Sequence, residues 1–222
     1  MTYSILAQDL STGAMGGAAA TGSLCVGGWV LRGDSRAGMS ASQGAAPSTL
    51  WGEDALELMR TGKNAAQTVT ALAHPDQGRD WRQLAVLDKH GGTASHTGQK
   101  NTDWKGAIDA PGLVVSGNLL SGPEVLDAAR DAFLDAQGTF ADRLLAALSA
   151  AEVAGGDTRG LQSAALLIVA PDAPPLTLRI DWAEAPIPAL KDLYRRSQTG
   201  DYASWARTVP TRTDPQRGHD TD

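Results

Sequence analysis

The chain has 222 residues, 42% of them hydrophobic, which is enough for one sizeable α/β or α+β unit. Its formal net charge of -6 at pH 7 argues against a protein that neutralises nucleic-acid phosphates. The single cysteine, Cys25, excludes an internal disulfide framework and zinc sites built from cysteine pairs. Without an export signal or a long apolar run, the sequence predicts a bacterial cytoplasmic protein that does not bind membranes.

The first half of the chain is predicted to begin with a β-hairpin and to continue into a helix pair. Residues 2–9 and 14–23 alternate as strands around a turn in which Gly13 can take a positive φ. Because side chains alternate along a strand, Thr2 and Ser4 share one face. A weaker strand pair is expected near residues 29–31 and 37–43, followed by helices from Thr49 and over 64–74.

The second half repeats this order of strands followed by a helix pair. Strands are predicted at 82–88, 93–98 and 113–118. The next helix is expected to start at Ser121, which caps it, with Glu124 closing a capping box, and a second helix follows from Phe140. Two strands, 163–170 and 176–182, and a helix over 188–197 complete the predicted elements.

This order of elements predicts an α+β fold of two stacked, mainly antiparallel sheets with helix pairs outside. The segment 163–170 is apolar throughout, as expected of a strand covered on both faces. No strands alternate singly with helices, which disfavours a doubly wound nucleotide-binding fold. We expect one domain over residues 1–207 and a disordered polar tail over 208–222, which has little apolar surface to bury.

Four segments carry a resemblance to a known family: TYSILAQD, SGNLLSGPEVL, LLAALSAAEVAGGDTRGLQSAALLIV and LRIDWAEAPIPALKDLY. They resemble an uncharacterised bacterial family of unknown function that is grouped with the N-terminal-nucleophile (Ntn) hydrolases, the superfamily of the proteasome β-type peptidases. The resemblance extends to about residue 200. It implies a four-layer αββα sandwich, in agreement with the order of elements, but it implies no substrate.

Thr2 is the candidate nucleophile that this resemblance implies. Enzymes of the superfamily use a Thr, Ser or Cys at the mature N-terminus, on the first strand. The α-amine of that residue, with a pKa of about 7.7–8.0, accepts the hydroxyl proton. Removal of Met1 ahead of Thr2 would expose such an amine. A threonine at position 2 of a strand is also common in proteins without this activity, so a structural role stays open.

The resemblance places supporting polar groups at two further regions. The first holds Ser116 and Asn118, and the second holds Asp157 and Ser163. Each residue also has a structural interpretation, because Asn118 can cap the following helix and Asp157 can bond backbone amides in its Gly-rich turn. For Ser163 the structural interpretation is favoured.

One departure from the proteasome pattern concerns the lysine that lowers the pKa of the nucleophile there. The corresponding segment here, residues 37–46, contains none. Ser40, Ser42 and Gln43 can supply hydrogen bonds but no positive charge, and the nearby cation is Arg36. The sequence therefore does not support a proteasome-like mechanism in detail.

Other potential sites receive less support. Cys25 lies in an apolar setting without a neighbouring histidine, which predicts a buried, inert thiol. The histidines are scattered, so we predict no metal and no cofactor. Several tryptophans are candidates for a ligand cleft, an oligomer interface or the core: Trp29, Trp51, Trp81 and Trp104.

The sequence thus favours an Ntn-type hydrolase that cleaves an amide bond in a small molecule or short peptide. The alternative is a non-catalytic protein of the same fold that binds a ligand or serves as an assembly subunit. Either version is predicted to form a homo-oligomer, namely a homodimer, on the basis of an exposed Trp51 and of the superfamily's tendency to assemble.

Overall fold

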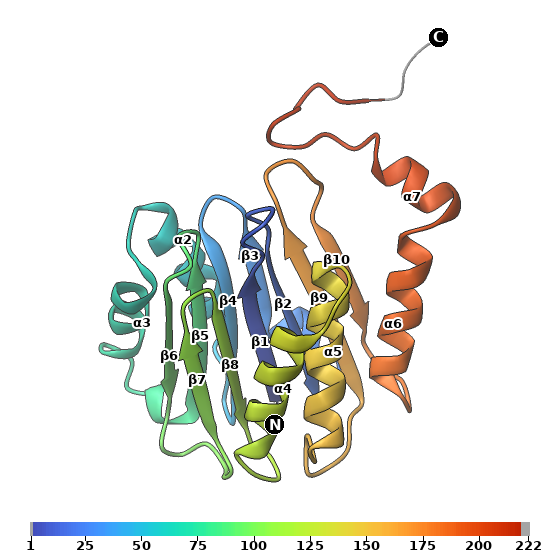
Figure 1. Cartoon of the computed structure of the whole chain (residues 1–222). Helices are drawn as coiled ribbons and strands as arrows, with labels where there is room; N and C mark the ends of the chain where they lie inside the picture. Colours follow the sequence, from blue (N-terminus) through green and yellow to red (C-terminus); the bar gives the residue numbers. More distant parts are fainter. Residues whose placement is uncertain (1, 219–222) are drawn as a thin grey trace.

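The computed structural model describes residues 2–218, which contain two antiparallel sheets stacked face to face (Figure 1). The six-stranded sheet has the order β10 (Leu176–Ile180), β9 (Ser163–Val169), β2 (Met15–Thr21), β1 (Thr2–Gln8), β8 (Leu113–Asn118), β7 (Gly106–Ala110). The four-stranded sheet has the order β3 (Leu31–Asp34), β4 (Gly38–Gly44), β5 (Arg82–Asp88), β6 (Thr93–Thr97). All neighbouring strands are antiparallel, which confirms the predicted sheets.

Helices cover the outer face of each sheet and complete four layers. The six-stranded sheet is covered by α4 (Glu124–Asp135), α5 (Phe140–Val153) and α6 (Pro186–Ser197). The four-stranded sheet is covered by α2 (Thr49–Arg60) and α3 (Ala65–Ala73). Three short helices lie outside these layers: α1 (Val26–Trp29), the 3-10 helix η1 (Arg79–Trp81) and α7 (Gly200–Ala206). The predicted αββα sandwich is confirmed.

Each boundary between layers holds its own apolar cluster. Leu166 lies between the large sheet and its helices, and Leu6 lies between the two sheets. Leu84 lies under α2 and α3. Small residues on β2 allow α5 to pack closely against the sheet. A Cβ added at Gly16 would lie only 2.8 Å from the ring of Phe140 on α5. The alanine- and glycine-rich second strand therefore sets the spacing of this layer.

Local signals were misleading at the start of α4 and around α1. The residue that caps α4 is Pro123, without a side-chain hydrogen bond, so the predicted capping box at Ser121 is wrong. The Ser121 hydroxyl instead donates to the carbonyl oxygen of Ala154. Trp29, where a strand was predicted to begin, is instead the last residue of α1, and the strand begins at Leu31; β7 and α7 were not predicted.

Two side chains differ from the predicted burial. Trp51 is only 5% exposed and packs in the core under α2, so the expectation of an exposed Trp51 is wrong. Cys25 is half-buried rather than buried, and it takes a left-handed φ of 61° at the start of α1. Trp29 is the contrasting case, since 54% of it is exposed.

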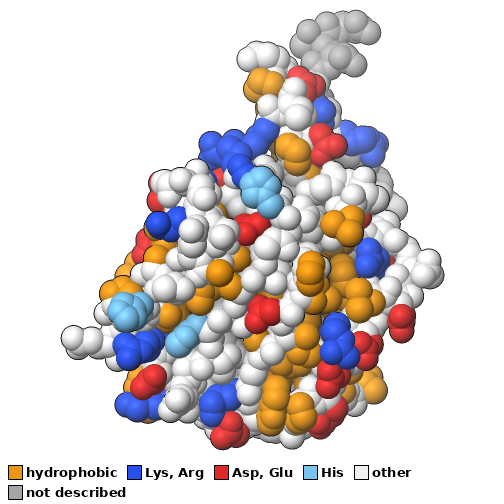
Figure 2. All heavy atoms as spheres, turned by 60° about the vertical axis from the view of Figure 1, so that its left-hand side comes forward, with side chains coloured by type: hydrophobic (Ala, Val, Ile, Leu, Met, Phe, Trp, Pro, Cys, Tyr) orange, Lys and Arg blue, Asp and Glu red, His pale blue; other side chains and the backbone are white. Residues whose placement is uncertain are grey.

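Acidic and basic side chains are interspersed over much of the face shown in Figure 2, which contains the α2 and α3 side of the molecule.

Within residues 2–218, none of the helices combines the length and the apolar character needed to cross a bilayer.

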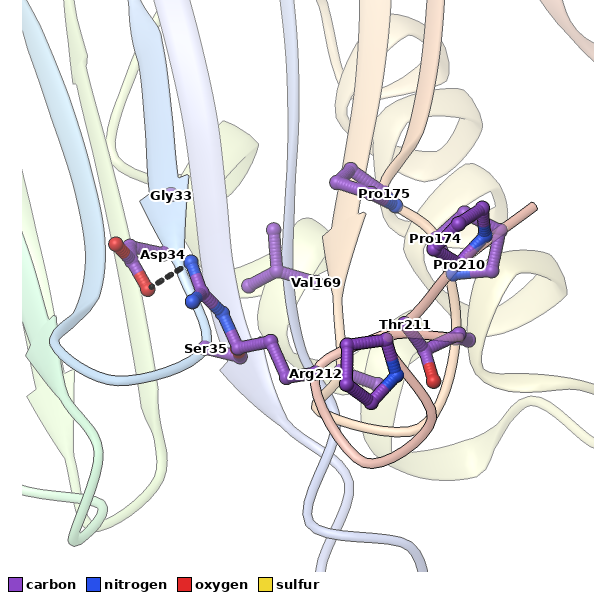
Figure 3. Close-up of a pocket in the computed structure, with 12 residues that line it drawn as sticks. Gly33, Asp34, Ser35, Val169, Pro174, Pro175, Pro210, Thr211 and Arg212 are labelled. Carbon is purple, nitrogen blue, oxygen red and sulfur yellow. Dashed lines mark ion pairs between the residues drawn. The ribbon is translucent and has the colours of Figure 1, made fainter. Parts of the chain in front are cut away.

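Residues 208–218 contact the fold, although their polar composition led us to expect a disordered tail. Thr211 is buried, and the amide of Thr213 donates to the carbonyl oxygen of Pro171 over 3.1 Å. The guanidinium of Arg212 lies 3.5 Å from the carboxylate of Asp34, the ion pair drawn in Figure 3. Residues 219–222 of the predicted tail lie outside the described part of the chain.

Asp34 is the buried anion to which this segment attaches. Its carboxylate also pairs with Arg36 at 3.0 Å and with Arg60 at 2.9 Å. Burial alone would raise the pKa of Asp34, but the hydrogen bonds from Arg36 and Arg60 outweigh it and hold the pKa well below its ordinary value. The carboxylate therefore stays ionised in the folded protein at acidic pH.

Gln83 on β5 joins the two sheets near the first residue of β1. The Nε2 of its fully buried carboxamide donates to the carbonyl oxygens of Gly117 at 2.8 Å and Gly106 at 3.0 Å, both in the opposite sheet. Its Oε1 accepts from Asn118 and from Gln43, each at 2.9 Å. Near the first residue of β1, the two sheets are thus joined by amide hydrogen bonds rather than by apolar packing.

Replacing Asp34 by asparagine should destabilise the protein in a pH-dependent manner. At pH 7, Asp34→Asn should lower the free energy of unfolding by about 1–3 kcal/mol, because charge-assisted hydrogen bonds are lost. The lowered pKa means that this contribution is present above the unfolded-state pKa of about 3.9 and disappears as the pH falls below it. Urea unfolding at pH 7 and at lower pH measures the difference.

The matched control for this prediction is Asp192→Asn. Asp192 pairs with Arg195 and Arg196 on the exposed side of α6, so its replacement should cost less than that of Asp34. Equal losses for the two variants at pH 7 would contradict the role given to Asp34.

Replacing Gln83 by leucine should destabilise the junction between the sheets. Gln83→Leu leaves the Asn118 amide and the Gly117 carbonyl without their buried partner, at a cost of more than about 2 kcal/mol. Thr97→Val removes only one hydrogen bond to Gln83 and should cost about 1 kcal/mol. Chemical denaturation measures both, and a smaller loss for Gln83→Leu than for Thr97→Val would rule out this assignment.

Candidate active site

Thr2, the first residue of β1, faces the space between the two sheets. The alternation predicted from the sequence holds, since Ser4 and Leu6 share that face and Tyr3 packs on the opposite side under the helices. The Thr2 hydroxyl donates to the hydroxyl of Thr21 over 3.3 Å. The Thr2 side chain thus lies at one end of the strand, beside the end of β2.

A cavity of about 410 Å³ opens at this position. Its polar wall is formed by Thr2, Thr21, Ser23, Gln43 and Arg159. The remaining lining residues are apolar or glycine: Leu24, Val26, Trp29, Val30, Gly44, Ala45 and Pro47. A volume of this size suits a small molecule or a short peptide segment. The predicted nucleophile is therefore next to a space that can hold a substrate.

Three cavities are larger, and two of them lie at the other end of the sandwich. One, of about 480 Å³, is lined by Asp34, Val169 and Arg212 among proline and alanine residues (Figure 3). The other, of about 700 Å³, lies between the β9–β10 hairpin and α7. The third, of about 590 Å³, lies between α5 and α6. None of the three is lined by any of the predicted catalytic residues, so the smaller cavity at Thr2 is the candidate site.

Ser116 and Asn118 lie beside Thr2 on the neighbouring strand. Asn118 is the register partner of Thr2, and its amide donates to Gln83. The Ser116 hydroxyl is 3.1 Å from that of Ser4. The structure thus brings these two predicted residues into the polar network under Thr2.

Gln43 extends this network to the four-stranded sheet. Its Nε2 lies 3.5 Å from the Thr2 carbonyl oxygen and 3.4 Å from the Ser116 hydroxyl. Its Oε1 is buried and has no hydrogen-bond partner among the described residues. Ser40 and Ser42 instead donate to carbonyl oxygens in and before α2, so they do not take part.

Asp157 supports the cavity through the backbone. Its carboxylate accepts a hydrogen bond of 2.5 Å from the amide of Gly22, which directly follows β2. It also accepts from the backbone amide of Arg159 at 2.9 Å and pairs with the guanidinium of that residue at 3.2 Å. Asp157 therefore holds two loops together, in line with the structural interpretation that the sequence left open.

Ser163 has a comparable anchoring role. Its hydroxyl donates to the carbonyl oxygen of Ser23 over 2.7 Å and accepts from the amide of Val26 over 3.0 Å. These bonds fix the loop that carries Leu24 and leads into α1. The favoured structural interpretation of Ser163 fits this geometry.

Sequence reasoning missed Gln83 and Arg159. Gln83 stands at a polar position in a strand pattern, which is typical of an exposed side chain, and only the stacking of the sheets buries it. Arg159 follows a predicted turn, and its place in the lining of the cavity at Thr2 depends on the pairing of β2 with β9. Across residues 2–218, no group of three or more His, Cys, Asp or Glu side chains is arranged to hold a metal ion.

Comparison with known proteins identifies relatives over nearly the whole chain. The crystal structure of a DUF1028 protein from Silicibacter pomeroyi is 54% identical, covers 99% of both chains and superposes with a TM-score of 0.95. That of HslV from Trypanosoma brucei is 17% identical and covers 75% of this chain and 98% of its own, with a TM-score of 0.44. No curated protein matches significantly. Since the profile of the family of unknown function DUF1028 matches residues 2–190, the chain belongs to that family.

Proposed function

We propose that this protein is an amide hydrolase of the N-terminal-nucleophile type, with Thr2 as the nucleophile. The observation that carries the proposal is the position of Thr2 at the start of β1, between the sheets and on the wall of the 410 Å³ cavity. The substrate is an amide bond in a small molecule or short peptide, in keeping with that volume.

In the proposed reaction, removal of Met1 makes the amine of Thr2 the general base. The amine accepts the hydroxyl proton while Oγ1 attacks the amide carbonyl carbon. Collapse of the tetrahedral intermediate breaks the C–N bond, and the protonated amine gives its proton to the leaving nitrogen. The amine then accepts a proton from a water molecule that attacks the acyl carbon, and it returns that proton to Oγ1 as the C–Oγ1 bond breaks, which releases the acid and restores Thr2.

The other predicted site residues act in this proposal as positioning groups. Ser116 and Asn118 support the strand beside Thr2 through Ser4 and Gln83. Asp157 and Ser163 hold the loops that border the cavity, as the bonds to Gly22 and Ser23 support. With neutral amides in place of the lysine of proteasome-type sites, activation of the hydroxyl depends on the α-amine.

The alternative function is ligand binding or assembly without catalysis. For either function we propose a cytoplasmic homodimer. Trp51 is buried, so it does not support the predicted dimer. The remaining support is the tendency of the superfamily to assemble. Light scattering distinguishes a dimer from a monomer, and turnover distinguishes the enzyme from the binding protein.

Replacement of Thr2 tests the enzymatic proposal. Thr2→Ala should abolish turnover of small amides and dipeptides while the protein stays folded, since the buried hydroxyl makes a long hydrogen bond to Thr21 whose loss costs about 1 kcal/mol. Thr2→Ser keeps the hydroxyl and amine within one residue and should retain part of the rate. A protein with one additional residue before Thr2 is the matched control, because its blocked amine should be as inactive as Thr2→Ala.

Intact mass before each assay establishes whether Met1 has been removed. Full turnover by Thr2→Ala, or equal turnover by the extended and processed forms, would move the chemistry away from the N-terminal residue.

A further inference from the structure

Arg159 contributes a positive charge to the wall of the cavity at Thr2. Among the described lining residues, the others are neutral, and no carboxylate is present. The Asp157 carboxylate that pairs with Arg159 lies behind this wall, with its side chain 0% exposed, whereas the Arg159 side chain is 44% exposed. A ligand in the cavity therefore meets the guanidinium and not its buried counter-ion.

The guanidinium is also held in place before any ligand binds. Its Nε lies 3.3 Å from Oδ1 of Asp157 and its Nη2 lies 3.2 Å from Oδ2. Asp157 is in turn fixed by the amide of Gly22. A guanidinium carries five N–H donors in a rigid plane that matches the geometry of a carboxylate. Restricting this side chain beforehand lowers the entropy lost when it binds a ligand.

The lining of the cavity also offers apolar surface. Leu24 is 53% exposed and Trp29 is 54% exposed, although both are large apolar side chains. The buried residues Val26 and Val30 line the same cavity. Ser163 fixes the loop that carries Leu24, as described above. Half-exposed apolar side chains around a cavity are typical of a surface that an apolar ligand group covers.

We propose that the cavity recognises an N-acylated apolar amino acid, with its free carboxylate bound by Arg159 and its side chain packed against Leu24 and Trp29. This class combines the three features that the walls provide for: a negative charge, an apolar group and an amide bond within reach of Thr2. Hydrolysis of that bond rests on the proposed function, whereas binding of the ligand does not. A cationic ligand has no counter-charge among the described lining residues.

Calorimetric titration with two matched probes tests this recognition without turnover. N-acetyl-L-leucine carries the carboxylate, and N-acetyl-L-leucinamide is its neutral counterpart. The titrations use full-length Thr2→Ala, which keeps the probes intact. The acid should bind about tenfold or more tightly than the amide, because it makes charge-assisted hydrogen bonds.

Variants assign the preference to particular walls. Arg159→Gln should remove the preference for the acid, and Arg159→Lys should retain part of it as a point charge. Trp29→Ala should weaken binding of both leucine probes without removing the preference. Arg130→Gln is the matched control, since Arg130 pairs with Asp127 and Asp131 on α4 and does not line the cavity.

The outcomes separate this inference from the proposed function. Equal affinity for the two probes, no binding of the acid at millimolar concentration, or a preference that survives in Arg159→Gln would overturn the inference. If Arg159→Gln does not fold because Asp157 loses its partner, the two-probe comparison and Arg159→Lys still decide. A preference for the acid without hydrolysis by the processed protein supports the inference and overturns the proposed function.

Discussion

The sandwich depends on the way its two sheets meet at the end that carries Thr2. Apolar side chains such as Leu6 and Leu87 fill most of the space between the sheets, but at this end the contact is made by the carboxamide of Gln83. Burying an amide without hydrogen bonds costs free energy, so the bonds of Gln83 to Gly117, Gly106, Asn118 and Gln43 restrict the separation and register of the strands more strictly than apolar packing does. The cavity beside Thr2 is built on that fixed frame.

The sequence predicts what local periodicity controls. The first hairpin, the shared face of Thr2 and Ser4, and the apolar strand 163–169 all follow from alternation or its absence, and the structure has each of them. The cap of α4 failed because Ser121 has a competing partner, the carbonyl oxygen of Ala154, at the end of another helix. A single-sequence pattern carries no information about such a contact.

Long-range pairing explains the parts of the site that the sequence did not predict. Gln83 and Arg159 are far from Thr2 in the sequence, and neither belongs to a motif. Their places depend on how β5 faces β8 and on how the turn after α5 meets the end of β2. Residues 208–218 are a similar case, because the buried carboxylate of Asp34 gives a polar segment an ionic partner that composition does not reveal.

The groups lining the cavity also restrict the chemistry available there. Its described side chains are hydroxyls, an amide, apolar groups and one guanidinium, none of which ordinarily titrates near neutral pH. A hydroxyl nucleophile needs a base that accepts a proton in that range. The α-amine of a processed Thr2 is such a base. Activation of the nucleophile therefore requires the removal of Met1. A protein that keeps Met1 would retain the cavity, with Arg159 and Trp29 in its wall, but it would not catalyse the proposed reaction.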